Sequence, residues 1–437
     1  MSAYLVYYLF LCAQRGGKRM KNCLVLLTKV FPFDKGEEFI EGEIKMLSAA
    51  FDKVILIATS VADNAVQTRS LPNNFEIHKI QASKIKHSLP VSAMGLFPFH
   101  NYKGCVDEDE RNAVKGSIKK KAYLTYFTAK ANSVLKEAKE IIDQYNLEEF
   151  DGITFYSYWL YDIAFVAIKL KELYGKKAKK VVSRTHRYDL YANENSMNYI
   201  PLRYHFLKNL DAVYPCSDNG SDYLKKLYPN YSEKIKTAYL GTKDYGVSEG
   251  SRDSVYRIVS CCHVSPVKRI DLLAKSLATL SKSGLKLKWT HFGAGDGLEE
   301  IKAYAKDNLD FMEVSFPGGV KNSELMDYYH KEPVDLFINT SSSEGLPVSI
   351  MEVCSFSIPT LATDVGGTAE IVKDGETGFL LDKDFEPKEL GEKIKYMVEL
   401  SKEEKQEFRD RCRNLWTKNF CAENNFKKFA QEIKTIK

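Results

Sequence analysis

The chain has 437 residues, of which 44% are hydrophobic and 28% are charged, and its formal net charge at pH 7 is +5. This composition excludes a wholly disordered protein, and the length exceeds one ordinary core, so we expect two α/β domains. The mild positive charge suits an anionic small ligand or a membrane surface and does not call for nucleic acid. The nine cysteines form no C-x-x-C pair, which argues against a zinc site and a disulfide framework and favours a cytoplasmic protein.

Residues 1–20 are apolar but do not resemble a membrane span. The stretch YLVYYLFLCA is shorter than the roughly 20 residues that a spanning helix needs, and no basic region precedes it as in a signal peptide. We interpret residues 1–20 as a leader or extension, with Met20 as a possible start of the protein. The alternative is a weak membrane-surface anchor, which would make the protein peripheral at the inner face of the membrane.

Patterns of buried strands and helices alternate through residues 21–248. The apolar runs 23–29 and 51–60 predict parallel strands, and the helical spacing of apolar residues in 36–50 predicts a helix between them. This strand–helix–strand order is typical of a Rossmann-like domain. Three later strands are predicted at 151–159, 179–186 and 210–217, with a helix at 160–175 between the first two.

Residues 85–130 interrupt this alternation, and we interpret them as an insertion on the first domain. Their first part is aromatic with little periodicity, whereas residues 116–142 predict a long basic helix. The insertion fits a place near an acceptor substrate, and an ordinary solvated helix with one buried face is the alternative.

A polar stretch rich in glycine and serine places a domain boundary near residue 248. The second domain is predicted at 249–415 and starts a new α/β alternation. Residues 416–437 end in an amphipathic helix with Phe426, Phe429 and Ile433 on one face. The predicted strands of the second domain are 256–265, 285–295, 334–341 and 359–365, and its helices are 270–280, 298–306 and 347–356.

The most informative segment is TSSSEGLPVSIMEVCSFSIPTLATDVGGTAEIV, residues 340–372. A strand ends in small residues, and Pro347 then opens a helix, a position that suits proline. The free N–H groups and the positive dipole end of such a helix favour a diphosphate. Glu344 precedes the helix and Glu352 lies within it, about two turns away. Two acidic acceptors beside an anion site suit the hydroxyl groups of a nucleotide sugar.

This segment resembles the E-x7-E signature of family 4 retaining glycosyltransferases, which have the GT-B fold. The resemblance implies two Rossmann-like domains that face each other across a cleft, with a C-terminal helix that crosses back to the first domain. It also implies that Glu352 binds the donor ribose and that Glu344 contacts the donor sugar. Gly345 and Leu346 would offer backbone N–H groups to the phosphates.

A second match to this family lies at IVSCCHVSPVKRIDLL, residues 258–273. Family members carry a lysine here that holds the pyrophosphate together with an arginine five residues earlier. Lys268 matches the lysine, but His263 stands in place of the arginine. Arg269, the next residue, is a candidate replacement because a guanidinium group suits phosphate well.

Two glycine turns complete the donor-binding candidates. The turn FGAGDG at 292–297, which contains Gly293, resembles the turn after the second donor-domain strand in this family, and we expect its glycines to keep the backbone out of the cleft. Gly36, after the first strand, would let the backbone approach a ligand. Glu37 and Glu38 beside it are accounted for by the start of a helix, where acids are favourable.

The catalytic candidates of the first domain lie in SRTHRYDLY, residues 183–191. Ligands bind at the carboxyl ends of strands in open α/β sheets, and here a predicted strand leads directly into His186 and Asp189. Family members carry a histidine and an aspartate with this spacing near the donor sugar. We expect His186 to hydrogen-bond the donor sugar and Asp189 to orient the acceptor or to support the loop.

The sequence at Asp107–Asp109 fits D-x-D, the metal-binding pattern of a different class of transferases. It lies in the charge run VDEDER and not at a strand end, so we interpret it as a solvated acidic loop. No other cluster has metal-ligand spacing. We therefore predict that the enzyme needs no metal and no bound cofactor.

The predicted activity is retaining transfer of a sugar from a UDP- or GDP-sugar to a glycan or lipid-linked glycan, in the synthesis of capsular polysaccharide, exopolysaccharide or lipopolysaccharide. Two alternatives stay open. One is a non-catalytic GT-B-like protein that binds a sugar or nucleotide. The other is an NAD-dependent oxidoreductase, which would need a G-x-G-x-x-G motif after a first strand, and neither half of the chain supplies it.

Overall fold

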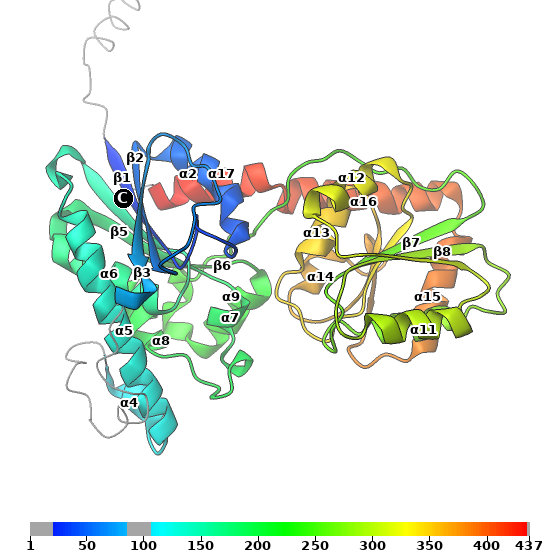
Figure 1. The fold of residues 1–437 in the computed structure, drawn as a ribbon, viewed down its shortest axis with the longest axis horizontal. Coiled ribbons are helices and arrows are strands. Elements are labelled where there is room, and N and C mark those ends of the chain that lie inside the picture. Colours follow the sequence, from blue (N-terminus) through cyan, green and yellow to red (C-terminus); the bar gives the residue numbers. More distant parts are fainter. Residues whose placement is uncertain (1–20, 85–105, 435–437) are drawn as a thin grey trace, which may run out of the picture. The chain divides into compact units, whose positions relative to one another are not determined.

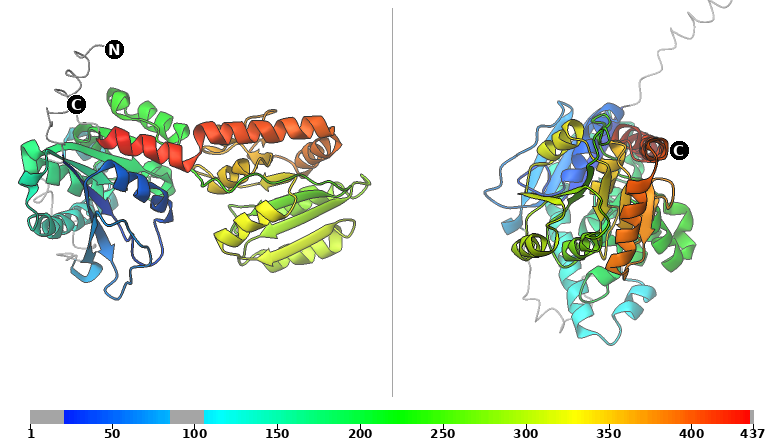
Figure 2. Two further views of the ribbon diagram at one scale, coloured as in Figure 1. Left: turned by 90° about the horizontal axis from the view of Figure 1, so that it is seen from above. Right: turned by 90° about the vertical axis from the view of Figure 1, so that its right-hand side faces the viewer.

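The computed structural model describes residues 21–84 and 106–434. The predicted leader and the first part of the predicted insertion, up to residue 105, therefore lie outside the described residues. Figures 1 and 2 show the described part as two units, each built on its own sheet.

The first unit contains the described residues up to Thr185, together with Ala192–Val213 and the residues from Ala430 on. The second contains His186–Tyr191 and Tyr214–Phe429. The domain boundary near residue 248 stays a prediction.

The first unit is built on a six-stranded parallel sheet with the spatial order β3-β2-β1-β4-β5-β6. All seven residues of β1, NCLVLLT, are buried, as expected of a central strand that is covered on both faces. The strands are β1 (Asn22–Thr28), β2 (Lys53–Val61), β3 (Phe75–Gln81), β4 (Gly152–Ser157), β5 (Ala178–Thr185) and β6 (Ala212–Pro215).

Helices cover both faces of this sheet. Figure 1 shows α5 and α6 on one face and α2 on the other. The long basic helix predicted at 116–142 is confirmed as α5, and Ser117 caps it by accepting the backbone N–H of Lys120. The helices of this region are α2 (Glu41–Ala50), α4 (Glu108–Val114), α5 (Ile118–Ile142), α6 (Asp162–Tyr174), α7 (Arg187–Leu190), α8 (Arg203–Asn209) and α9 (Asp218–Leu227).

The second unit has a six-stranded parallel sheet with the order β12-β11-β10-β7-β8-β9. Its core gathers apolar side chains around the fully buried Trp289. The strands are β7 (Tyr256–Cys261), β8 (Leu287–Phe292), β9 (Glu313–Gly318), β10 (Leu336–Asn339), β11 (Thr360–Thr363) and β12 (Gly378–Leu381).

Figure 1 shows α11 and α15 on one face of the second sheet and α12, α13 and α16 on the other. The last helix, α17, starts in the second unit, and its final residues belong to the first. There Lys180 donates to the carbonyl oxygen of Glu432 at 2.7 Å. The helices are α10 (Ile270–Ala278), α11 (Leu298–Asn308), α12 (Asn322–Lys331), α13 (Val348–Ser355), α14 (Thr368–Ile371), α15 (Pro387–Glu399), α16 (Lys402–Asn419) and α17 (Ala422–Lys434).

Both sheets therefore have the strand order of the Rossmann fold, and the predicted pair of Rossmann-like domains is confirmed. In this order the chain reverses direction across the sheet between β1 and β4 in the first unit and between β7 and β10 in the second. Loops at the carboxyl ends of these strands diverge, and ligands of open α/β sheets bind there.

The strands that the sequence patterns missed are β3, β9 and β12, and each lies at an edge of its sheet. The residues of β3 are mostly half-buried, and those of β9 are half-buried or exposed. The sequences of β3 and β9 therefore lack the continuous apolar run of a central strand, whereas β12 is apolar but only four residues long.

The prediction of a solvated loop at Asp107–Asp109 is wrong in its local structure. Residues from Glu108 on form helix α4, and the Asp107 side chain caps it by accepting the backbone N–H of Glu110 at 3.0 Å. Acidic residues suit this place because the N-terminal end of a helix carries a partial positive charge.

Across residues 21–84 and 106–434, none of the helices combines the length and the apolar character that crossing a bilayer requires.

Candidate functional site

Lys268 and Glu344 form an ion pair where the loops after β7 and β10 diverge. Lys268 lies in the loop after β7, and Glu344 lies in the loop after β10. The Lys268 Nζ atom is 2.6 Å from the Glu344 Oε1 atom, and Asn339, at the end of β10, donates to the same oxygen at 3.3 Å. The Glu344 side chain is 11% exposed and that of Lys268 is 27% exposed, so the pair is accessible but partly shielded from water.

Thr340 joins the two loops that carry this pair. Its hydroxyl group donates to the carbonyl oxygens of Lys268 and Arg269, each at 3.0 Å. The backbone of the β7 loop is thus tied to the end of β10. This arrangement holds the Lys268 ammonium group next to the Glu344 carboxylate.

Two glycines allow close backbone approach behind Glu344. A Cβ atom on Gly366 would lie 2.0 Å from the carbonyl oxygen of Glu344, and Gly366 has a φ of +57°. The backbone N–H of Gly367 donates to the carbonyl oxygen of Gly345 at 2.7 Å. The predicted motif VGGTAE therefore supports the Glu344 loop from behind, and any larger residue at position 366 would displace it.

Helix α13 begins directly after this loop at Val348, and Pro347, predicted as its first residue, is its N-cap. Leu346 is buried, so its predicted role rests on its backbone N–H group, and Gly345 is half-buried. Val348, the first residue of α13, follows Glu344 by four residues in the chain. This places helix N–H groups and a lysine at the same edge of the sheet.

Glu352 lies on α13 and is half-buried. Among the described residues, its one side-chain donor is Asn322, at the start of α12, whose Nδ2 atom lies 2.8 Å from Oε1. Burial raises the pKa of the Glu352 carboxyl group, and the Asn322 hydrogen bond acts in the opposite direction. The carboxylate can still accept hydrogen bonds from the hydroxyl groups of a ligand.

Arg269 braces the protein backbone. Its Nε, Nη1 and Nη2 atoms donate to the carbonyl oxygens of Thr340, Lys383 and Ser341 at 2.7, 2.5 and 3.4 Å. Its φ of +50° turns the chain into α10. Arg269 stays a predicted donor-binding residue, but to bind a phosphate its guanidinium group would have to give up these carbonyl contacts.

His263 and Gly293 lie in the loops after β7 and β8. The His263 side chain is exposed. Gly293 has a φ of +154°, and a Cβ atom there would lie 1.8 Å from the carbonyl oxygen of Cys262. Gly293 therefore packs against the β7 loop, a structural role that is compatible with keeping the backbone clear of a ligand.

His186 and Asp189 form a short turn after β5. The Asp189 carboxylate is fully buried and accepts the backbone N–H of His186 at 2.6 Å. Of the two roles predicted for Asp189, this geometry supports that of a loop residue. His186 is the N-cap of α7 and is almost fully buried.

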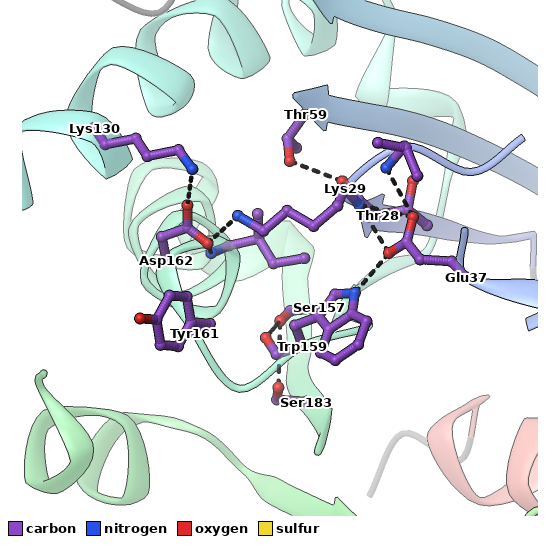
Figure 3. A network of polar contacts seen from close by, with 12 residues as sticks. Thr28, Lys29, Glu37, Thr59, Lys130, Ser157, Trp159, Tyr161, Asp162 and Ser183 are labelled. Carbon is purple, nitrogen blue, oxygen red and sulfur yellow. Dashed lines mark hydrogen bonds and ion pairs between the residues drawn. The ribbon is translucent and has the colours of Figure 1, made fainter. Parts of the chain in front are cut away.

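Glu37 is a residue that sequence reasoning underrated. Its carboxylate accepts the backbone N–H groups of Lys29, Val30 and Phe31 at 2.9, 2.7 and 2.7 Å. It also accepts the indole N–H of Trp159, from the loop after β4, at 2.6 Å. Figure 3 shows this carboxylate between the two loops. Glu37 thus organises the β1 loop, in which Gly36 has a φ of +118°.

Asn322 and Asn339 were missed and Glu37 was underrated because their hydrogen-bond partners are fixed only by the folded loops. A signal existed only for Glu37, which follows a central strand and a glycine. Within residues 21–84 and 106–434, no three His, Cys, Asp or Glu side chains gather closely enough to hold a metal ion.

A family model described as glycosyl transferases group 1 matches residues 245–415. The O-antigen biosynthesis glycosyltransferase WbnH of Escherichia coli is 30% identical over 30% of this chain, and the match covers 38% of that protein. The chain therefore matches less than half the length of this curated relative.

Two solved structures cover nearly the whole chain. One is Alr3699/HepE of Anabaena in complex with UDP, with a TM-score of 0.60 and 15% identity over 95% of this chain and 99% of that one. The other is the lipopolysaccharide outer core galactosyltransferase WaaB, with a TM-score of 0.64 and 14% identity over 95% of this chain and 100% of that one. These likenesses support the GT-B fold. Over residues 245–415, the chain is therefore similar to the group 1 glycosyltransferases.

Proposed function

We propose that this protein is a retaining glycosyltransferase that moves a sugar from a UDP- or GDP-sugar to a glycan or lipid-linked glycan. The observation that carries the proposal is the Lys268–Glu344 pair at the divergence of β7 and β10, with Glu352 on the helix that follows. The context that we propose is synthesis of a cell-surface polysaccharide, which the name of the relative WbnH supports.

In this proposal the diphosphate of the donor takes over the Lys268 ammonium group from Glu344. Phosphate oxygens carry more negative charge than one carboxylate, so they compete well for the lysine. Glu344, once released, accepts hydrogen bonds from the hydroxyl groups of the sugar. The backbone N–H groups of Gly345 and Leu346, together with the start of α13, add positive potential beside the phosphates.

Glu352 binds the ribose of the nucleotide in this proposal. Its carboxylate is held by Asn322, which leaves acceptor capacity for two neighbouring hydroxyl groups. Contacts beyond the ribose would determine which nucleotide base the protein prefers. UDP is the first nucleotide to test because the solved structure of HepE is a complex with UDP.

The transfer step that we propose retains the configuration at the anomeric carbon. The bond from this carbon to the diphosphate oxygen breaks as the acceptor oxygen attacks from the same face. The acceptor proton passes to a phosphate oxygen of the leaving group, so no protein nucleophile is needed. Lys268 and the start of α13 stabilise the charge that develops on the diphosphate. An inverted product anomer would contradict this step.

His186 is the catalytic candidate of the first half of the chain. In this proposal it donates a hydrogen bond to the donor sugar in the transition state. His186→Ala should therefore lower kcat more than it weakens donor binding. A variant with unchanged kcat would remove His186 from the mechanism.

The first test is a thermal-shift titration with UDP, GDP, ADP and NAD. A ligand at 100 times its Kd stabilises the folded protein by about 2.7 kcal/mol, which is visible as a raised Tm. The expected result is a rise with UDP or GDP that Glu352→Ala abolishes. The matched control is Glu392→Ala, which removes an exposed glutamate of α15 whose recorded ion-pair partner is Lys388.

Other results of this titration would support one of the two alternative functions. A rise with NAD alone would indicate an oxidoreductase. A rise with UDP or GDP without any transfer to glycan acceptors would indicate a non-catalytic binding protein.

A further inference from the structure

The two sheets carry a similar pair of residues at the same topological position. In the second unit, Lys268 follows β7, and Glu344 stands five residues beyond the end of β10. In the first unit, Lys29 follows β1, and Asp162 stands five residues beyond the end of β4. Lys29 and Asp162 also form an ion pair. Each unit thus places a lysine and a carboxylate where ligands of this fold bind.

The pair in the first unit has a second lysine. Lys29 contacts Oδ1 of Asp162, and Lys130, from the middle of α5, lies with its Nζ atom 3.3 Å from Oδ2. Figure 3 shows the two ammonium groups on either side of this one carboxylate. Asp162 is 2% exposed, whereas the side chains of Lys29 and Lys130 are 23% and 24% exposed. Part of each lysine side chain is therefore exposed, whereas the acid is buried.

One lysine is sufficient to neutralise a buried aspartate. The second lysine adds a positive charge in a partly buried place, where the repulsion between two ammonium groups is weakly screened. Burial lowers the pKa of the Lys29 ammonium group, Asp162 acts against this effect, and the neighbouring Lys130 lowers the pKa further. An anionic ligand that contacts both lysines would relieve this repulsion.

Glu37 is the other acid close to Lys29, and its charge raises the Lys29 pKa. Its oxygens are directed at four N–H groups, namely three backbone amides and the indole of Trp159. Glu37 therefore holds the Lys29 backbone in position, while the two ammonium groups pair with Asp162.

We propose that Lys29 and Lys130 bind an anionic group, a phosphate or a carboxylate, on the acceptor substrate. This inference rests on the proposed function, because it names the acceptor class of the same enzyme. Asp162 holds the two lysines apart and aligned in the free protein. The ligand contacts the outer side of both ammonium groups, so Asp162 keeps its place. A lysine suits either ligand, since it acts as a point charge with three donors.

The experiment uses the full chain and three probes of equal simplicity: methyl glucuronide, glycerol 1-phosphate and the neutral methyl glucoside. Their Kd values are measured by NMR titration at low and at high salt. The variants are Lys130→Gln and Lys29→Gln, each of which leaves Asp162 one lysine. The matched control is Lys136→Gln on the same helix, because the Lys136 side chain is 76% exposed and is recorded in an ion pair with Glu140. Thermal shift with UDP and GDP is measured in parallel.

We expect the two charged probes to bind at least tenfold more tightly than methyl glucoside, and salt to weaken them. Lys130→Gln and Lys29→Gln should each weaken them about tenfold, whereas Lys136→Gln should have no effect. Tighter binding of methyl glucuronide would identify an acidic sugar, and tighter binding of glycerol 1-phosphate would identify a phosphorylated or lipid-linked acceptor.

The inference is overturned if charged and neutral probes bind alike, or if both lysine variants lower only the Tm and leave probe binding unchanged. The lysines would then serve only to neutralise Asp162. A UDP or GDP shift that persists in that case leaves the proposed function standing. A different outcome is that neither UDP nor GDP raises the Tm of the wild-type chain although the anionic probes still bind. That result would overturn both the acceptor role and the proposed function.

Discussion

The Nζ atom of Lys268 lies 2.6 Å from Oε1 of Glu344, although 76 residues separate them in the chain. The ion pair exists because β7 and β10 are neighbours in the sheet and their loops diverge at the same edge. In the proposed donor complex, Lys268 would bind the diphosphate and Glu344 the donor sugar. In the free protein the pair keeps both side chains in place.

Lys268→Gln should weaken the binding of UDP or GDP about tenfold or more, which corresponds to about 1.4 kcal/mol or more. The physical reason is the loss of the ammonium group that contacts the diphosphate. Titration calorimetry measures the effect. Lys275→Gln is the control, because Lys275 is a half-exposed lysine of α10 that pairs with Asp271. Equal affinities of the Lys268 variant and the wild type would remove Lys268 from the donor site.

Binding of the neutral nucleosides uridine and guanosine should weaken as the pH falls through the raised pKa of Glu352. A protonated carboxyl group is a poorer acceptor for ribose hydroxyl groups, and burial raises this pKa, so the loss begins at a higher pH than for an ordinary glutamate. Glu352→Gln should lack this pH dependence. A pH profile shared by wild type and variant would contradict the assignment of Glu352 to the ribose.

The raised pKa of Glu352 makes folding stability change with pH in the opposite direction to nucleoside binding. The folded protein holds the Glu352 proton more tightly than the unfolded chain does. Its contribution to stability is therefore present at low pH and decreases as the pH rises from the unfolded through the folded pKa. Melting temperatures of the wild type and Glu352→Gln across this range measure the difference.

Asp189→Ala should lower the free energy of unfolding by about 1 kcal/mol, because the backbone N–H of His186 loses its acceptor. Asp189→Asn should keep most of the activity and stability, since the side-chain carbonyl group of asparagine can accept the same N–H. Melting curves and transfer rates of both variants test this. An Asn variant that folds normally but is inactive would show that the charge of Asp189 acts on the substrate.

Glu37→Ala should lower the free energy of unfolding by about 3 kcal/mol, because four N–H donors in a largely buried place lose their common acceptor. Glu38→Ala is the neighbouring control, with an expected effect within about 0.5 kcal/mol, since the Glu38 side chain is 58% exposed. The Tm of each variant reports the difference. Equal Tm values would indicate that water replaces the carboxylate without loss.

Transfer should continue in the presence of EDTA. The reason is that, in the proposed mechanism, Lys268 and the start of α13 would supply the positive charge that a divalent ion supplies in other transferases. The measurement is the rate of sugar transfer with EDTA, followed by addition of Mg²⁺ or Mn²⁺. A loss of activity that either ion restores would contradict the prediction of a metal-independent enzyme.

The sequence by itself determined the central strands, the long helix α5 and the E-x7-E segment. Central strands such as β1 and β10 are covered on both faces, so continuous apolar runs mark them. The segment 340–372 carries its information locally, because the strand end, the small residues, Pro347 and both glutamates follow one another in the chain. The edge strands β3 and β9 escaped detection because exposed and half-buried residues interrupt that pattern, and β12 is only four residues long.

Only the tertiary structure decided which residues work together. Lys29 and Asp162 are 133 residues apart, and neither has a neighbour in the chain that indicates the other. The contacts Asn322–Glu352 and Glu37–Trp159 likewise join residues that are distant in the chain. The physical reason is that a parallel sheet brings together the carboxyl ends of strands that are distant in sequence, and the order of those strands follows from packing of the whole domain.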